Sequence, residues 1–297
     1  MASSPDAWHG INDGTMLACN KQAGGWQARL SLGFERREDA TVLVRREHVG
    51  PLRVQKPFHP EGPAVCHTLV LHPPAGIAGG DELEFAVRVG DEAHALLTTP
   101  GAGKWYRSAG SWASQTIRLE VGAAGVLEWL PQETIVFDGA RARMQMRVSL
   151  AANACFIGWE VLCLGRRASG ECFDSGAIHM HTRIEREGRP IWLERGTLEG
   201  GAPLFHSSAG LAGYSTCATL LATAGAGPDA SVIRACRELI PEEAGALHGL
   251  TQLPDILVAR YLGHSSEAAR NWMTALWHLL RPAMPGRVAI DPRIWRT

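Results

Sequence analysis

The sequence predicts a mainly β fold, a single domain of many short strands in a β-helix-like or stacked-sheet arrangement with two α-helices near the C-terminus. Between residues 26 and 222, apolar and polar residues alternate with a period of two in one short run after another. Glycine, proline and aspartate separate these runs about every 8–12 residues, as is typical of all-β folds. After residue 229 the apolar period lengthens to that of a helix.

The chain begins with a segment that we expect to be a flexible N-terminal arm. Residues 1–25 are rich in alanine, serine, glycine and asparagine and show no period. The chain has 297 residues, which suits one large domain, so we expect residues 26–297 to form a single β domain that includes the C-terminal helices.

Strand patterns follow one another from Trp26 onward. The run at 154–164 is apolar nearly throughout, as expected of a strand that is covered on both faces. The runs predicted to be strands cover residues 26–32, 41–54, 65–71, 85–89, 93–99, 117–121, 126–130, 144–150, 154–164, 178–184, 190–198 and 215–222.

The C-terminal quarter predicts two helices around one strand. A short helix can run from a cap at Asp229 to Ile240, and residues 256–262 resemble a strand. The stronger helix spans residues 266–281, with Ser265 or Ser266 as its cap and a proline after it. Its apolar stripe consists of Ala269, Trp272, Met273, Leu276, Trp277, Leu279 and Leu280, and we expect it to pack on the sheets.

Composition excludes several classes of protein. A net charge of −1 and a pI near 6.9 do not favour nucleic acid or an anionic membrane as partner. No stretch has the roughly 18 uninterrupted apolar residues of a membrane span, and the N-terminus shows no signal peptide. Seven cysteines without a CxxC pair indicate buried thiols in a reducing compartment, and we expect the protein to be cytoplasmic.

Two long glycine-rich turns lie close together in the sequence. The first is HPPAGIAGGD at residues 72–81 and the second is TTPGAGKWYRS at residues 98–108. Glycine permits positive φ and close approach of another backbone, and a turn that only reverses the chain needs fewer such residues. The pair therefore suggests a site. It is not a P-loop, because Trp105 stands where that motif needs serine or threonine.

Two histidines and five acidic residues are candidate metal ligands. His179 and His181 share one face of a predicted strand, which is either a solvated polar face or a transient metal-binding pair. Glu160 lies in the most apolar strand, so it needs either an ion pair with Arg166 or Arg167 or a watered passage. The other acidic candidates are Asp81, Glu133, Asp138 and Glu171.

Several spaced motifs together resemble the UreD family of urease accessory proteins, called UreH in some organisms. The resemblance covers roughly Trp26 to Trp295. The motifs are the two glycine turns, LPQE at 130–133 with IVFD at 135–138, Glu160 with GR at 165–166 and GE at 170–171, and residues 258–263 before the last helix. One departure is Ala75, which stands where the family usually has the first glycine of Pro-Gly-Gly. If that position needs positive φ, alanine costs about 1 kcal/mol there.

The resemblance implies a β-helix-like fold with two helices and a protein that is not an enzyme. Such proteins bind the urease apoprotein and, through UreF, the nickel-carrying GTPase UreG. The assembly delivers nickel to the urease active site, whose lysine becomes carbamylated, through an internal passage for the ion. No tightly bound cofactor is implied, only transient Ni²⁺.

The resemblance also implies roles for individual residues. Asp81 and Glu171 are expected to face the nickel passage, with Glu133, Asp138 and Glu160 as lesser candidates. The turn motif includes His72, Gly79 and Gly80, while Lys104, Tyr106 and Arg107 are expected to hold the second turn or to meet a partner. On apolar area alone, we expect the C-terminal helix and tail, with Trp272, Trp277 and Trp295, to contact UreF.

Two alternatives come from the residues alone. One is a metal-dependent hydrolase that uses His179, His181 and a carboxylate. The other is a β-type binding module, for example for carbohydrate, which would use some of the ten tryptophans. A metal that stays bound in the presence of a chelator would favour the hydrolase.

Overall fold

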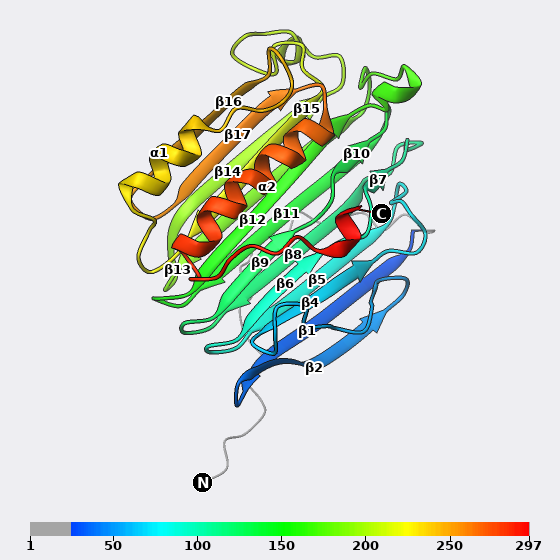
Figure 1. Ribbon diagram of the computed structural model, residues 1–297. Coiled ribbons are helices and arrows are strands. Elements are labelled where there is room, and N and C mark those ends of the chain that lie inside the picture. Colours follow the sequence, from blue (N-terminus) through cyan, green and yellow to red (C-terminus); the bar gives the residue numbers. More distant parts are fainter. Residues whose placement is uncertain (1–24, 297) are drawn as a thin grey trace.

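Two β-sheets lie face to face in the computed structural model, which describes residues 25–296 (Figure 1). The seven-stranded sheet has the order β14-β13-β11-β8-β5-β1-β2. Its strands are β14 (Arg189–Glu199), β13 (Ala177–Arg186), β11 (Arg141–Leu150), β8 (Ala113–Val121), β5 (Glu82–Val89), β1 (Gln27–Arg37) and β2 (Ala40–Val49).

The second sheet has ten strands, eight of them in the order β16-β17-β15-β12-β9-β6-β4-β3. Two short strands, β10 and β7, extend it alongside β12. The bounds are β16 (Leu247–Gln252), β17 (Leu257–Gly263), β15 (Thr216–Thr223), β12 (Cys155–Leu164), β9 (Val126–Leu130), β6 (His94–Thr98), β4 (Val65–Leu71), β3 (Arg53–Val54), β10 (Thr134–Val136) and β7 (Gly103–Trp105).

From β4 to β13 the chain passes alternately between the two sheets, except that the short strands β7 and β10 follow β6 and β9 in the same sheet. Strands β5, β8, β11 and β13 are parallel neighbours in one sheet. Strands β4, β6, β9 and β12 are parallel neighbours in the other. Each circuit therefore adds one strand to each sheet, which confirms the predicted β-helix-like arrangement. Antiparallel strands close both ends, for example β2 beside β1 and β14 beside β13.

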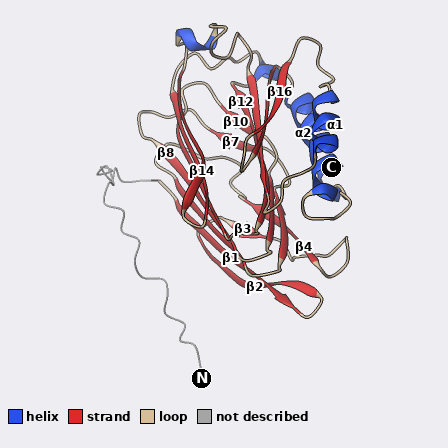
Figure 2. Ribbon diagram, turned by 90° about the vertical axis from the view of Figure 1, so that its left-hand side faces the viewer, coloured by secondary structure: helices blue, strands red, loops and turns tan. Residues whose placement is uncertain are grey.

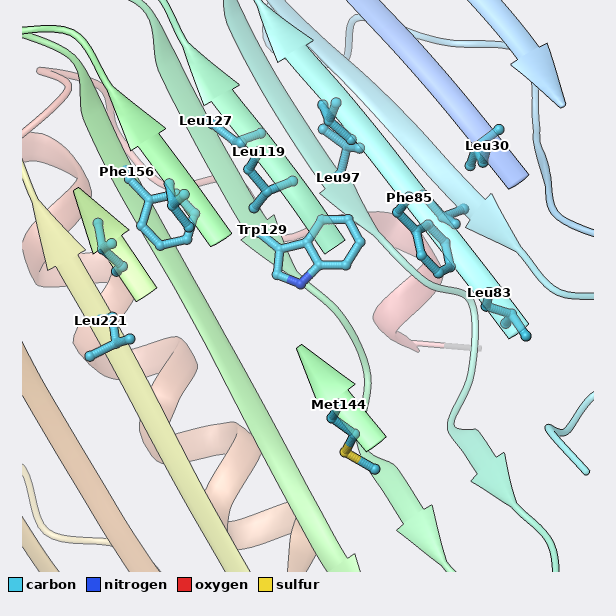
Figure 3. Packing of buried hydrophobic residues seen from close by; sticks show 14 of the residues in the cluster. Leu30, Leu83, Phe85, Leu97, Leu119, Leu127, Trp129, Met144, Phe156 and Leu221 are labelled. Atoms are coloured by element: carbon cyan, nitrogen blue, oxygen red, sulfur yellow. The ribbon is translucent and has the colours of Figure 1, made fainter. Parts of the chain in front are cut away.

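The main hydrophobic core lies between the sheets, where period-two alternation places the apolar side chains of both. Phe85 and Leu119 from the seven-stranded sheet approach Leu97 and Trp129 from the other (Figure 3). Phe85 and Trp129 meet edge to face, with ring centroids 6.3 Å apart. Strand β12 is covered on both faces, as predicted, because its opposite face carries a second core beneath the helices.

Both α-helices cover the outer face of the ten-stranded sheet (Figure 2). Helix α1 (Ala230–Glu238) begins at Asp229, whose carboxylate accepts hydrogen bonds from the next backbone N–H groups. Helix α2 (Ser266–Ala283) begins at the predicted cap, Ser265. Three short 3₁₀ turns are η1 (Arg167–Ser169), η2 (Pro203–Phe205) and η3 (Arg293–Arg296). Among residues 25–296, no helix is both long and apolar enough to cross a bilayer.

The structure differs from the sequence prediction in a few places. Pro282 lies inside the last turn of α2, because that helix ends one residue after it. Strands β7 and β10, of three residues each, and the mostly exposed β16 were not predicted, since none shows a clear apolar alternation. The expected N-terminal arm lies almost entirely outside the described residues.

Candidate functional site

The two glycine turns are in direct contact in the structure. The Ile77 N–H donates to the Lys104 carbonyl at 2.7 Å, and the Tyr106 N–H donates to the Ile77 carbonyl at 2.9 Å. The Tyr106 ring lies against Gly76, where a Cβ atom would be 2.2 Å from the ring. Glycine is therefore needed at 76 because the second turn occupies the space of a side chain.

The end of the first turn also depends on its glycines. Gly80 has φ +97° and donates its N–H to the Trp112 carbonyl at 3.1 Å. A Cβ on Gly79 would lie 2.4 Å from Ser108 Oγ. Ala75 has φ +61°, so the condition stated above for a strained alanine is met.

Asp81 holds the first turn together. Its two carboxylate oxygens accept hydrogen bonds from the Trp26 and Ala78 N–H groups, each at 2.8 Å. The nearby His72 has a pKa below its usual value because it is desolvated, and the Asp81 charge opposes this shift only in part. Asp81 does not line the inter-sheet cavities described below, whereas His72 does. The expectation that Asp81 faces a passage is thus not matched by its position.

Glu171 and Asp138 are bound to each other's surroundings in a cluster of hydrogen bonds and ion pairs beside η1. Glu171 accepts from the Asp138 N–H at 3.0 Å and from Arg166 at 2.6 Å, and the Arg166 guanidinium is the main reason that the pKa of Glu171 is lowered. Asp138 binds Arg107 at 2.5 Å and accepts from the Ser175 N–H at 2.8 Å. Arg166 is engaged here and Arg167 donates to Cys172 Sγ at 3.1 Å, so the expected ion pair of Glu160 with Arg166 or Arg167 is wrong.

Two adjoining cavities lie between the sheets. Their volumes are about 300 and 470 Å³. The smaller one is lined by parts of both glycine turns, including His72, Gly101 and Lys104. The residues that line both are Met146, Trp159, Glu160, Met180 and Thr182.

Glu160 is the one of the five predicted acidic residues that lines these cavities. Burial, followed by the nearby Glu194 carboxylate, raises the pKa of Glu160 to about 7. Glu194 on β14 is itself bound to Arg260 on β17 at 2.7 Å, so this ion pair joins the two sheets at the wall of the larger cavity. Glu133 lies outside the cavities, 3.6 Å from Arg270.

The predicted histidine pair lies on the outer face of the seven-stranded sheet, away from the cavities. The His179 ring packs on Trp112, with centroids 4.4 Å apart. The pKa of His181 is lowered by burial and then by Arg195 and Arg183. Positive neighbours also oppose a bound cation. Within residues 25–296 no group of three or more histidine, cysteine or acidic residues could hold a metal ion.

The three C-terminal tryptophans pack against other parts of the same chain. Trp272 and Trp277 are 3% and 0% exposed, and their indole N–H groups donate to the Leu239 carbonyl and to Glu128. Trp295 packs on Trp159 and donates to Thr98 Oγ1 at 2.9 Å. Trp272 and Trp277 are therefore not presented to a partner, and the apolar-area argument for a UreF contact is wrong for them. A contact through other residues of α2 stays a prediction.

Sequence reasoning missed most of the cavity wall. The signal was present for Met146 and Met180, which alternate with polar residues on β11 and β13 and so had to point inward. No sequence signal paired Glu194 with Arg260, because the two strands are brought together only by the stacking of the sheets.

Comparison with known proteins decides the family. The model of the family described as UreD urease accessory protein matches residues 27–296. The chain belongs to the UreD family.

Curated relatives agree over nearly the whole length. The Urease accessory protein UreD of Dechloromonas aromatica (strain RCB) is 56% identical over 274 residues, which are 92% of this chain and 95% of the relative. The protein of the same name from Azoarcus sp. (strain BH72) is 55% identical, with 92% and 95% covered. UreD proteins are accessory proteins and not enzymes, so the hydrolase alternative is wrong.

Proposed function

We propose that this chain is a cytoplasmic scaffold of urease maturation that passes nickel ions between its two sheets. It binds the urease apoprotein and, through UreF, the GTPase UreG. Nickel is the cargo and not a resident cofactor. The observation that carries the proposal is the pair of adjoining cavities with Glu160 on their shared wall.

The chemistry of Glu160 suits transient binding. Because its pKa is about 7, this carboxyl group carries its proton part of the time at neutral pH and must release it to bind a cation. The proton competes with the cation for this carboxyl group, so the apparent affinity for the cation falls as the pH falls through neutral. A passage needs such weak sites, since it must release each ion that it takes up.

The two cavities on either side of Glu160 support a path for the ion that runs along the sheets. On one side the smaller cavity extends to Gly101 and Lys104 of the second glycine turn. On the other side the larger cavity extends to the Glu194–Arg260 ion pair, which joins the edge strand β14 of one sheet to β17, the strand next to the edge of the other. A divalent ion leaving Glu160 for Glu194 has to compete with Arg260, so this pair is placed to limit exchange with solvent.

The test is the change Glu160→Gln in cells that express the urease subunits with UreF and UreG. Glutamine keeps the shape of the side chain but cannot become an anion. We expect the complex to assemble normally, while the nickel content and the activity of the urease fall severalfold. Glu199→Gln on exposed β14 is the matched control and should leave both unchanged. Full activation with Glu160→Gln would remove Glu160 from the passage, and failure of the unmodified chain to bind urease or UreF would overturn the proposed function.

A further inference from the structure

The outer face of the seven-stranded sheet carries a concentration of arginines. Both α-helices lie beyond the other sheet, so neither covers this face (Figure 2). We call it the arginine face, defined by Arg118 on β8, Arg143 and Arg147 on β11, Arg183 on β13 and Arg195 on β14. Their neighbours in sequence, such as Ala142, Val148 and Leu119, are buried between the sheets, so strand alternation directs these arginines outward.

Three of these arginines stand side by side in register. Arg118 is paired with Arg147 across β8 and β11, and Arg147 with Arg183 across β11 and β13. Neighbouring strands are about 4.8 Å apart, and like charges directly opposite one another destabilise a sheet. Such a row does not favour folding. Departures from the rule that like charges avoid one another in a sheet occur mostly at functional sites.

Few acidic groups offset this charge. Glu185 binds Arg147 at 2.8 Å and Arg183 at 2.9 Å. Arg118, Arg143 and Arg195 form no ion pair within residues 25–296, and neither does Glu120, two positions along β8 from Arg118. Glu84 on the adjoining strand β5 is bound to Arg29. The whole chain has a net charge of −1, so the excess of positive charge here is local.

The arginine face is continuous with the glycine turns. The Arg143 guanidinium lies 4.7 Å from the centre of the Trp112 ring. The Trp112 carbonyl accepts the Gly80 N–H of the first turn, and the two turns contribute His72 and Lys104 to the smaller cavity. A partner seated on this face would thus lie next to the turns that line the cavity.

We propose that the arginine face docks an acidic surface of the urease apoprotein. This inference rests on the proposed function. Arginine presents a planar fork of donors that matches carboxylates, and complementary charge speeds encounter and fixes register. Nucleic acid is a less suitable partner, because the carboxylate of Glu185 lies between Arg147 and Arg183 and would repel phosphate groups.

The experiment measures binding of the full-length chain to purified urease apoprotein. The test variant combines Arg118→Glu with Arg195→Glu, because both side chains are exposed and lose no internal ion pair. The control combines Arg46→Glu with Arg234→Glu, which makes the same change in net charge on exposed residues elsewhere. We expect the test variant to bind at least about tenfold more weakly and the control to bind normally. Added salt should weaken the unmodified chain more than the test variant.

Other results would overturn the inference. If the unmodified chain binds urease and the test variant binds equally well, the arginine face is not the docking surface and the proposed function survives. If the unmodified chain does not bind urease at all, both fail. If duplex DNA binds the unmodified chain at physiological salt, and the test variant loses only that binding, the face recognises nucleic acid instead. Circular dichroism of each variant verifies that it is folded.

Discussion

At the scale of single residues, Ala75 has a strained backbone conformation that lowers the stability of the fold. Its φ of +61° lies in the left-handed region, which costs a non-glycine residue roughly 1–2 kcal/mol. The residue is exposed, and its N–H still closes the turn onto the His72 carbonyl at 2.9 Å. The neighbouring glycines and Asp81 thus impose the conformation on residue 75.

The change Ala75→Gly should therefore stabilise the protein. Glycine removes the strain, but it also increases the entropy of the unfolded chain, so we expect a net gain of about 0.5–1 kcal/mol in the free energy of unfolding. Urea denaturation measures this gain. Ala78→Gly is the control in the same turn, because Ala78 has no positive φ and should lose stability when replaced. Equal effects of the two changes would contradict the assignment of strain to residue 75.

The candidate site was predictable in its residue types but not in their roles. The sequence marks Asp81, Glu171 and Glu160 as carboxylates in unusual surroundings. It cannot tell a carboxylate that caps a turn from one that faces a cavity, because the difference depends on which backbone N–H groups approach it. Asp81 receives two such groups, whereas Glu160 faces the opposite sheet.

At the scale of elements, α2 is fastened to the sheet by buried charges as well as by apolar packing. Arg281, which is 0% exposed, binds Glu61 at 2.7 Å and Glu128 at 3.1 Å. Glu128 is also bound by His94 at 2.6 Å. Burial alone would raise the pKa of Glu61, but hydrogen bonds from His67 and Arg281 lower it to about 2. The network joins the loop that carries Glu61, the three strands β4, β6 and β9, and the helix α2.

Replacing Arg281, the cation at the centre of this network, should lower the free energy of unfolding. Arg281→Met leaves Glu61 and Glu128 buried without it, so we expect a loss of about 3–5 kcal/mol at neutral pH. Both carboxyl groups have lowered pKa values in the native chain, so their stabilising effect is present at neutral pH and is lost as the pH falls. The deficit of the variant should therefore shrink in acid. Urea titrations at several pH values measure it, and Arg234→Met at an exposed position of α1 should change stability by less than about 0.5 kcal/mol. A deficit that does not depend on pH would show that the lost contacts are apolar.

Most elements could be predicted because alternation and capping are local properties. The strand at β12 and the caps at Asp229 and Ser265 are examples that the structure confirms. The pairing of strands could not be predicted. Strand β5 pairs with β8, whereas β6, which follows it in the chain, belongs to the other sheet. This choice depends on contacts between residues far apart in sequence, and the alternation of β5 would be the same if it paired with β6.

At the scale of the whole molecule, the layers of the fold enclose three buried thiols. Cys66 lies between the sheets, and Cys155 and Cys236 lie between the ten-stranded sheet and the helices. Burial raises the pKa of Cys66 to about 11 and that of Cys155 to about 12. Cys172, beside η1, is exposed.

Thiol labelling should therefore report separation of the layers. In a Cys19→Ser background, which removes the one thiol outside the described residues, we expect Cys172 to react with a disulfide reagent within minutes. Cys66, Cys155 and Cys236 should react far more slowly and at rates that rise together with urea, because each is reached only when sheets or helices part. Mass spectrometry of labelled peptides follows each site, with Cys172→Ser as the control for the fast phase. If Cys155 and Cys236 were labelled well before Cys66, the helices would open independently of the two sheets, and the layers would not unfold as one unit.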